Sequence, residues 1–295
     1  MASVTVLIPA RNAEKTLGET FDSFVTQTFR DFDILLVNDA SSDATVTIAE
    51  SYSGRLDIAV LPSAGNLGVA GALNFGLMHI NSPYIARIDA DDLAMPTRLE
   101  KQFNFLESHS SIDVISTAME VFYDNGNPSH LLTKPEGDAA IKTSLLQFCS
   151  MSHGASMFRK SFFDDVGIFD LRYDYAEDYD LWCRGALLGK HYANLSEPLS
   201  RYRQHGNQVS KQKRMLQYER DLAIKRKYIS ALLGGRPSGY LAEFFSGSTV
   251  FPNKDIAFSV LEQSMPLLFK LSGRVADEKV YADIVSECIG RILRI

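Results

Sequence analysis

The chain has 295 residues, of which 45% are hydrophobic and 22% charged, so it can form one large or two smaller water-soluble globular domains. Its formal net charge of −6 argues against a nucleic-acid-binding protein, which would present a basic surface. Cys149, Cys183 and Cys288 form no CxxC pair, which argues against a zinc site or a disulfide framework. We see no secretory signal pattern and no apolar run long enough to span a membrane, so we expect a cytoplasmic protein.

Strands and helices alternate through the first hundred residues. Apolar runs predict buried strands at residues 4–8, 32–38, 58–61 and 84–88. Helical patterns lie between these strands: one at 17–25, one that ends near residue 52, and one at 72–80 that follows a loop at 65–71. This alternation predicts a mostly parallel sheet with helices on both faces, an α/β fold. Ligands in such sheets bind at the carboxyl ends of the strands, where four polar segments of this chain gather.

The second half of the chain has a mixed pattern that becomes wholly helical near its end. Strands are predicted at residues 113–117, 152–158, 192–195 and 199–203, and helices at 96–106, 139–148, 159–166 and 174–188. Basic clusters and helical patterns follow from residue 211. We therefore predict an α/β domain at residues 1–210 and a helical region at 211–295.

Three carboxylates, Asp89, Asp91 and Asp92, stand where the strand at 84–88 should end. Like charges this close repel one another unless a positive group lies among them. Hard oxygen ligands suit Mg²⁺ or Mn²⁺, which proteins usually bind through one or two carboxylates together with substrate phosphates. The pattern favours such a metal site, and an acidic turn that caps the next helix is the alternative.

Five segments together carry a resemblance to a known family. They read VTVLIPARNAEKTLGETFDSFVTQTFRDFDILLVNDASSDAT, NLGV, ARIDADDLAMPTRLEKQ, YAEDYDLWCR and YRQHGNQVS, and they occur in the family's order. With these segments the chain resembles the non-processive family 2 glycosyltransferases, which use nucleotide sugars and have the GT-A fold. The resemblance covers residues 3–210 and stops before the helical region.

The resemblance implies roles for the acidic strand end. It makes Asp89 and Asp91 the two carboxylates of the family's DxD motif, with Asp91 as the direct ligand of Mn²⁺ or Mg²⁺ and Asp89 on ribose or metal-bound water. His205 resembles a late histidine that approaches the metal or the diphosphate in relatives. A metal there would neutralise the charge that builds on the leaving diphosphate.

A base must take the proton of the attacking acceptor hydroxyl, and a carboxylate is the usual choice. Glu177-Asp178 resembles the family's ED motif, in which the Asp acts as the base. The resemblance therefore implies that Asp178 is the base. On a helix the two side chains point about 100° apart, so only one can face the substrate. Asp174 and Asp180 are competing carboxylates, and a helix N-terminus stabilised by acidic residues is the structural alternative.

The resemblance also implies a set of nucleotide contacts. Pro9, Ala10 and Arg11 resemble the first contact loop, and Asp39 resembles the position that meets uracil or ribose. Two residues of the NLGV segment, Asn66 and Gly68, would close over the other side. Asp39 as a helix cap and Arg11 as a surface charge are the structural alternatives. The helix that follows reads Ala72-Leu73-Asn74 where many relatives have ARN.

Four further side chains are weaker candidates. His153 lies where relatives line the acceptor side, and Arg201 and Arg203 offer charge that would offset phosphate, although alternate strand positions face opposite ways. Trp182 has a helical spacing that fits core packing better than sugar stacking.

The expected activity is that of an inverting, metal-dependent glycosyltransferase. The donor would be a nucleotide sugar, a UDP-sugar first, and the acceptor a saccharide or lipid-linked saccharide that would bring the protein to the membrane surface. Polysaccharide synthesis is the expected setting. A catalytically silent nucleotide-sugar-binding subunit and a sugar-phosphate nucleotidyltransferase are the alternatives, although the N-terminal loop lacks the latter's glycine-rich, basic pattern.

Overall fold

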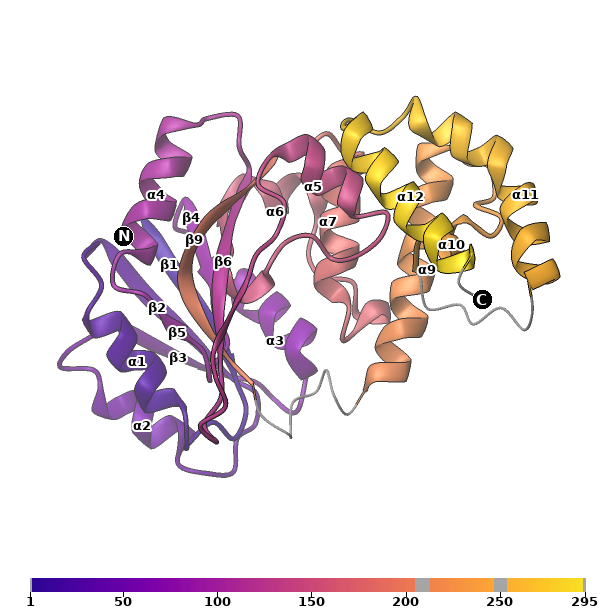
Figure 1. The fold of residues 1–295 in the computed structure, drawn as a ribbon. Helices are drawn as coiled ribbons and strands as arrows, with labels where there is room; N and C mark the ends of the chain where they lie inside the picture. Colours follow the sequence, from indigo (N-terminus) through magenta and orange to yellow (C-terminus); the bar gives the residue numbers. More distant parts are fainter. Residues whose placement is uncertain (1, 205–212, 247–253, 294–295) are drawn as a thin grey trace.

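The computed structural model describes residues 2–204, 213–246 and 254–293. Within these ranges a mixed sheet has the strand order β3-β2-β1-β4-β8-β6-β9-β5, and β7 pairs with β6. Figure 1 shows this sheet between helices, with the C-terminal helices gathered at one side. His205 and the turn expected at residues 206–208 lie outside the described residues.

The first half of the sheet is parallel, as the sequence predicts. It contains β1 (Val4–Ala10), β2 (Phe32–Asn38), β3 (Ile58–Pro62) and β4 (Tyr84–Arg87), connected by α1 (Leu17–Val25), α2 (Thr45–Ser51) and α3 (Gly68–Leu77). Helix α3 begins at Gly68, four residues before the predicted start. The reason is Asp39, whose carboxylate accepts hydrogen bonds from the backbone N–H groups of Leu67 (2.7 Å) and Gly68 (3.0 Å) and so starts the helix early.

The second half of the sheet is mixed. Its strands are β5 (Leu93–Ala94), β6 (Val114–Phe122), β7 (His130–Leu132), β8 (Met157–Arg159) and β9 (Tyr192–Arg203). β8 runs antiparallel between β4 and β6, and β9 lies parallel to β6. The two strands predicted at 192–195 and 199–203 are one strand, β9, whose register against β6 shifts beside Ala118.

The strand predicted at residues 152–158 is wrong over its first half. Residues His153–Ala155 form a 3-10 turn, η1, and only Met157–Arg159 pair as β8. The apolar and small residues of this segment are buried by tight packing of the turn rather than by pairing in the sheet. A Cβ added at Gly154 would lie 3.0 Å from Arg87 Nη1 and 3.2 Å from Asp92 Oδ2, so the absence of a side chain is what lets the turn approach.

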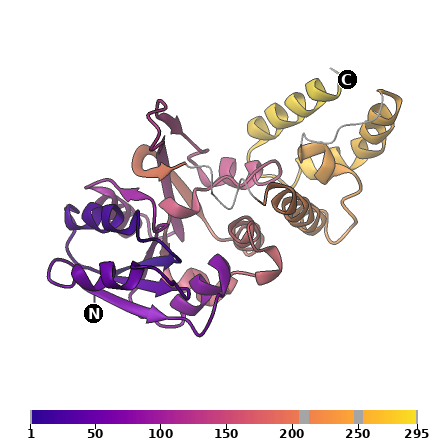
Figure 2. The same ribbon diagram turned by 90° about the horizontal axis from the view of Figure 1, so that it is seen from below.

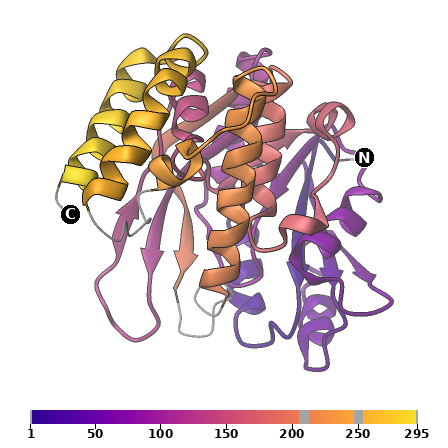
Figure 3. The same ribbon diagram turned by 90° about the vertical axis from the view of Figure 1, so that its right-hand side faces the viewer.

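The remaining helices cover the sheet and extend beyond it. They are α4 (Arg98–Ser108), α5 (Asp138–Ser144), α6 (Lys160–Val166), the 3-10 turn η2 (Leu171–Tyr173), α7 (Glu177–Leu187), α9 (Arg214–Leu232), α10 (Leu241–Ser246), α11 (Lys254–Ser272) and α12 (Glu278–Leu293). Figure 2 shows α10–α12 far from α1 and α2, and Figure 3 shows the long helix α9 beside α7. None of the described helices combines the length and apolar character needed to cross a membrane.

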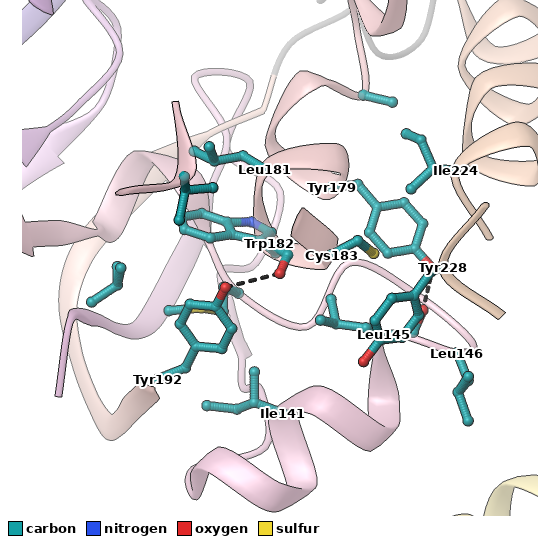
Figure 4. Close-up of a cluster of buried hydrophobic side chains, with 14 of the residues drawn as sticks. Ile141, Leu145, Leu146, Tyr179, Leu181, Trp182, Cys183, Tyr192, Ile224 and Tyr228 are labelled. Carbon is teal, nitrogen blue, oxygen red and sulfur yellow. Dashed lines mark hydrogen bonds between the residues drawn. The ribbon is translucent and has the colours of Figure 1, made fainter. Parts of the chain in front are cut away.

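The sheet separates two hydrophobic cores. Alternate residues of β1 face opposite sides: Val6 and Ile8 pack with α1, α2 and α4, whereas Leu7 packs with α3. The core that contains Leu7 and α3 continues through α5, α6 and α7 into α9–α12. Figure 4 shows this continuation, where Tyr179 of α7 lies against Ile224 and Tyr228 of α9.

Candidate active site

A cleft of about 530 Å³ lies beside the carboxyl end of β4 and is closed on one side by α7. Its lining brings together the strand-end carboxylates, the acidic start of α7 and a residue of α9. The described lining residues are Val69, Arg87, Asp89, Asp91, Asp92, Met119, Leu132, Lys134, Cys149, Met151, Ser152, His153, Gly154, Tyr175, Glu177, Asp178, Tyr202 and Gln217. Two groups of carboxylates, far apart in the sequence, therefore share one cleft.

The backbone of the turn at residues 89–92 is held by two hydroxyl groups at the start of α1. The hydroxyls of Thr16 and Thr20 each donate a hydrogen bond of 3.0 Å to the Ala90 carbonyl, and Asp92 N donates to Asp89 O at 3.2 Å. The short strand β5 follows at once and pairs with β9. Contacts on both sides thus fix the backbone that presents Asp89 and Asp91.

Arg203, at the end of β9, attaches that strand to the acidic turn. Its backbone N–H donates to Asp92 Oδ1 (2.9 Å) and its Nε donates to the Asp91 carbonyl (2.9 Å), while its guanidinium also pairs with Glu19 and Asp124. The side chain is nearly fully buried. Arg203 therefore positions the turn.

The charge of the acidic turn is partly offset by two arginines inside the protein. Arg87 forms a bidentate ion pair with Asp89, and buried Arg98 donates to the Arg87 carbonyl at 2.6 Å. Burial lowers the pKa of Arg98 to about 9, and the nearby Asp92 opposes that shift. Burial, with the charges of Asp89 and Asp91, raises the pKa of Asp92.

The 3-10 turn η1 lies directly over these charges. A Cβ added at Gly154 would lie within 3.4 Å of Asp89 and Asp92. His153 beside it is 9% exposed and packs against Phe169 and Trp182, with ring centroids 5.1 and 6.1 Å away. Burial and the charge of Arg87 lower the pKa of His153 well below its usual range. His153 is therefore a neutral imidazole in the wall of the cleft, and Trp182 is a core residue, as its spacing predicts.

Glu177 and Asp178 begin α7 and face the same cleft. Burial and the charge of Asp178 raise the pKa of Glu177 to about 7, and burial also raises the pKa of Asp178. Tyr175, two residues earlier, has a positive φ of 76°, which is uncommon for a residue with a side chain and directs the ring into the cleft lining. Arg220 of α9 lies 5.4 Å from that ring.

The residues predicted to hold the nucleotide lie along the same sheet edge, outside the described lining of the cleft. Pro9 and Ala10 end β1, and Arg11 is exposed. Asp39 is buried, and besides starting α3 its Oδ1 accepts from Ser63 Oγ at 3.1 Å. Gly68 has φ +72°, and Asn66 Oδ1 accepts from its N–H at 3.2 Å. Their contacts to a nucleotide stay predictions.

The structure thus brings Asp89, Asp91 and Asp178 into one cleft, while His205 lies outside the described residues. Several cleft residues are absent from the sequence-based set, among them Arg87, Lys134, Cys149, Tyr175 and Gln217. Arg87 had a signal, because a charged residue inside a buried strand needs a partner. Tyr175 opens the segment YAEDYDLWCR, but Lys134, Cys149 and Gln217 gave no signal, because their segments reach the cleft only through the tertiary fold.

A divalent metal fits this site only with help from a substrate. No group of three or more His, Cys, Asp or Glu side chains in the described part of the chain is arranged to bind a metal. Asp89 is paired with Arg87, and Asp91 beside it also lines the cleft, so these two carboxylates are the ones that would hold a metal. Mg²⁺ and Mn²⁺ suit this arrangement, because one or two carboxylates commonly suffice when phosphate oxygens complete the shell.

Solved structures with a similar fold support the architecture. The chain matches S. aureus TarS 1–349 in complex with UDP-GlcNAc with a TM-score of 0.68 and 20% identity, covering 98% of this chain and 92% of that one. It matches the mannosyltransferase PcManGT from Pyrobaculum calidifontis, in complex with GDP-Man and Mn²⁺, with a TM-score of 0.60 and 15% identity, covering 99% and 81%. The fold is that of GT-A glycosyltransferases.

Sequence comparisons give the family. The chain is 33% identical to an uncharacterized glycosyltransferase of Haemophilus influenzae, covering 78% of this chain and 74% of that protein. It is 32% identical to the amylovoran biosynthesis glycosyltransferase AmsE of Erwinia amylovora, covering 71% and 79%. The model of glycosyl transferase family 2 matches residues 5–167. The chain therefore belongs to glycosyl transferase family 2 and is a glycosyltransferase.

Proposed function

We propose that this glycosyltransferase moves a sugar from a nucleotide sugar, a UDP-sugar first, to a hydroxyl of a saccharide or lipid-linked saccharide acceptor, with inversion and with a divalent metal. The observation that carries the proposal is the shared cleft, which Asp91 and Asp178 line from two distant segments. Synthesis of a polysaccharide is the proposed setting, in keeping with AmsE, a glycosyltransferase of amylovoran biosynthesis.

Asp178 is the proposed general base. The acceptor oxygen attacks the anomeric carbon, its proton passes to the Asp178 carboxylate, and the sugar–phosphate bond breaks on the opposite side, so one displacement inverts the anomeric configuration. Burial raises the pKa of Asp178 and so strengthens it as a base. Glu177, whose pKa is raised to about 7, shares the charge of the pair.

Asp91, with Asp89 beside it, would hold the metal against the diphosphate. When bound, the ion supplies positive charge to the leaving group. The protein contributes a fixed turn, because Thr16, Thr20 and Arg203 hold its backbone. Pro9, Ala10, Arg11, Asp39, Asn66 and Gly68 are the proposed contacts of the nucleoside, and His205 is a proposed further contact of the metal or diphosphate.

The acceptor is proposed to enter past Tyr175 and Gln217. These residues line the side of the cleft formed by the start of α7 and by α9. An aromatic ring with a polar neighbour suits a sugar ring, which offers an apolar face and hydroxyl edges.

Thermal unfolding with a nucleotide panel tests the donor side. A ligand that binds the folded state raises the melting temperature by mass action. We expect UDP with Mn²⁺ to raise it more than GDP, dTDP, CDP or ADP, and a chelator to abolish the shift. A response to no nucleotide would contradict the proposed donor site.

Asp178→Asn tests the base. Loss of a general base lowers transfer by about 10²–10⁴-fold, while UDP binding should stay unchanged because the variant keeps the shape of the side chain. Asp174→Asn, at a neighbouring carboxylate, is the control and should retain transfer. Full activity of Asp178→Asn would overturn the assignment, and a chain without transfer to any acceptor would favour the silent subunit.

A further inference from the structure

Asp178 receives one side-chain hydrogen bond in the described part of the chain, and the donor is a cysteine. Cys149 Sγ lies 3.4 Å from Asp178 Oδ2, within hydrogen-bond reach for sulfur. The other oxygen, Oδ1, accepts from the backbone N–H of Tyr179 at 2.8 Å. Cys149 and Asp178 both line the cleft, so the contact lies where the proposed chemistry occurs.

The thiol has two acceptors within reach but only one proton. The second acceptor is the Met151 carbonyl, 3.6 Å from Cys149 Sγ. A hydrogen bond to a charged acceptor is stronger than one to a neutral carbonyl, and the carboxylate is also nearer. The thiol therefore donates its proton to Asp178 Oδ2 rather than to the Met151 carbonyl.

The backbone that carries Cys149 is itself anchored. Lys134 Nζ donates a hydrogen bond of 2.8 Å to the Cys149 carbonyl and lies 5.2 Å from the centre of the Phe148 ring. This contact ties the segment after α5 to the chain that follows β7. The thiol consequently approaches Asp178 from a fixed position, as a group that orients another side chain must.

We propose that Cys149 is a positioning residue for the base: its thiol donates a hydrogen bond that holds the Asp178 carboxylate in the orientation that faces the acceptor. This inference rests on the proposed role of Asp178. The sequence offers no motif for it, because Cys149 stands 29 residues from Asp178 in a segment without a signature.

Other charged groups also face Asp178, and their effects differ in kind. Glu177 is its neighbour on α7, Arg87 and Lys134 act on it as positive charges, and Asp221 of α9 interacts with it as a negative charge. None of these four donates a hydrogen bond to its carboxylate. Burial first, and then the negative charge of Asp178, raise the pKa of the Cys149 thiol.

The thiol itself reports the contact, without any substrate. Removing the charge with Asp178→Asn should lower the pKa of Cys149 and increase its reaction with the neutral disulfide dithiodipyridine at pH 8. Because a thiolate becomes less nucleophilic as its pKa falls, each tenfold gain in thiolate should give roughly a threefold faster reaction. Peptide mass spectrometry assigns the modified cysteine, and buried Cys183 and Cys288 serve as internal references.

Asp174→Asn is the matched control for this reaction, since it removes a carboxylate that no described contact joins to Cys149. An Asp178→Asn variant that melts like the wild type and reacts no faster than the Asp174→Asn control would overturn the proposal. A rate increase confined to Cys149 in Asp178→Asn supports it.

Two substitutions of the cysteine test its effect on the base. Loss of the donor in Cys149→Ala should move the acidic limb of the transfer pH profile to higher pH, because the carboxylate loses a stabilising hydrogen bond. Cys149→Ser keeps a donor and should restore the limb toward the wild-type position. Identical profiles in both variants would contradict the proposal. If the thiol reaction test fails while Asp178→Asn loses transfer, the positioning role alone is refuted. If the thiol test is positive but Asp178→Asn transfers sugar as fast as the wild type, the proposed base is refuted.

Discussion

Glu177 stands at a residue position where burial and charge act together. Its side chain is 7% exposed, its Oε2 has no hydrogen-bond partner among the described residues, and Asp178 follows it directly. Both effects disfavour the ionised form, which is why its pKa rises from 4.5 to about 7. A carboxyl group held this way is costly to the folded state once it ionises.

This shift predicts how stability depends on pH. A folded-state pKa above the unfolded value means that the native chain binds more protons between pH 4.5 and 7, so Glu177 lowers stability as pH rises through that window. Glu177→Gln cannot ionise and should be more stable than the wild type at pH 8, by on the order of 1–2 kcal/mol, with the difference vanishing near pH 4. Denaturant unfolding at both pH values measures it.

Glu219→Gln is the control for this comparison, because Glu219 is exposed on α9. It should unfold like the wild type at both pH values. Equal stabilities of Glu177→Gln and the wild type at pH 8 would show that Glu177 is ionised at no cost.

At the scale of elements, β9 and the acidic turn form one unit through Arg203. The guanidinium and backbone of Arg203 together contact Glu19, Asp91, Asp92 and Asp124. A lysine has a single ammonium and cannot reproduce this fork of donors. Arg203→Lys should therefore loosen the turn and weaken metal-dependent nucleotide binding by about tenfold, measured by calorimetric titration of UDP and Mn²⁺.

Arg201→Lys, two residues earlier on the same strand, provides the matched control. The Arg201 side chain pairs with Glu120 (2.8 Å), and among the described residues no hydrogen bond or ion pair joins that side chain to the turn. The control should bind nucleotide like the wild type. Unchanged binding in Arg203→Lys would mean that Thr16 and Thr20 suffice to hold the turn.

Helices α7 and α9 are joined by a buried charge. Asp180 is 1% exposed and pairs with Arg184 (2.6 Å) and with Lys227 of α9 (3.1 Å). Asp180→Ala removes the partner of both cations and should lower the free energy of unfolding by about 2 kcal/mol, somewhat less than a fully buried pair because both cations reach solvent. Thermal unfolding measures this, and Glu197→Ala, at the exposed pair with Lys101, should leave the midpoint unchanged.

Element by element, the sequence was informative where the pattern is local. The four parallel strands and the helices between them follow from apolar spacing, and all four strands are present. The 3-10 turn at His153–Ala155 did not follow, because the same small and apolar residues fit a strand and only the approach of Gly154 to Arg87 decides between them. Similarly, β5 is two residues long and exists because β9 pairs with it.

The same distinction holds for the cleft. Motifs predict Asp89, Asp91 and Asp178, and all three line the cleft. The sequence also suggests that Arg203 offsets phosphate charge, and in the structure its side chain holds the acidic turn. Cys149 and Gln217 reach the cleft from segments whose sequences carry no motif. A contact made by two distant segments cannot be read from the spacing of either one.

For the molecule as a whole, one hydrophobic core reaches from α3 to α12. Ile224, Tyr228 and Ile229 of α9 are buried in the same cluster as Tyr179 and Trp182 of α7. Because this core joins residues 1–210 to the helical region, we expect the two to unfold together. We expect calorimetry of the full chain to show one cooperative transition with equal calorimetric and van't Hoff enthalpies. Two resolved transitions would indicate that the helical region unfolds separately.

The division of the interior by the sheet has a consequence for engineering. Residues that pack α1, α2 and α4 belong to a core that contains none of the described residues of α9–α12. Exchanging the C-terminal helices between relatives would therefore require repacking only the side formed by α5 and α7. The contacts of Thr16, Thr20 and Arg203 that hold the acidic turn would stay unchanged. Chimeras with new acceptor preferences are best joined after β9, with the buried face of α7 carried along with its matching α9.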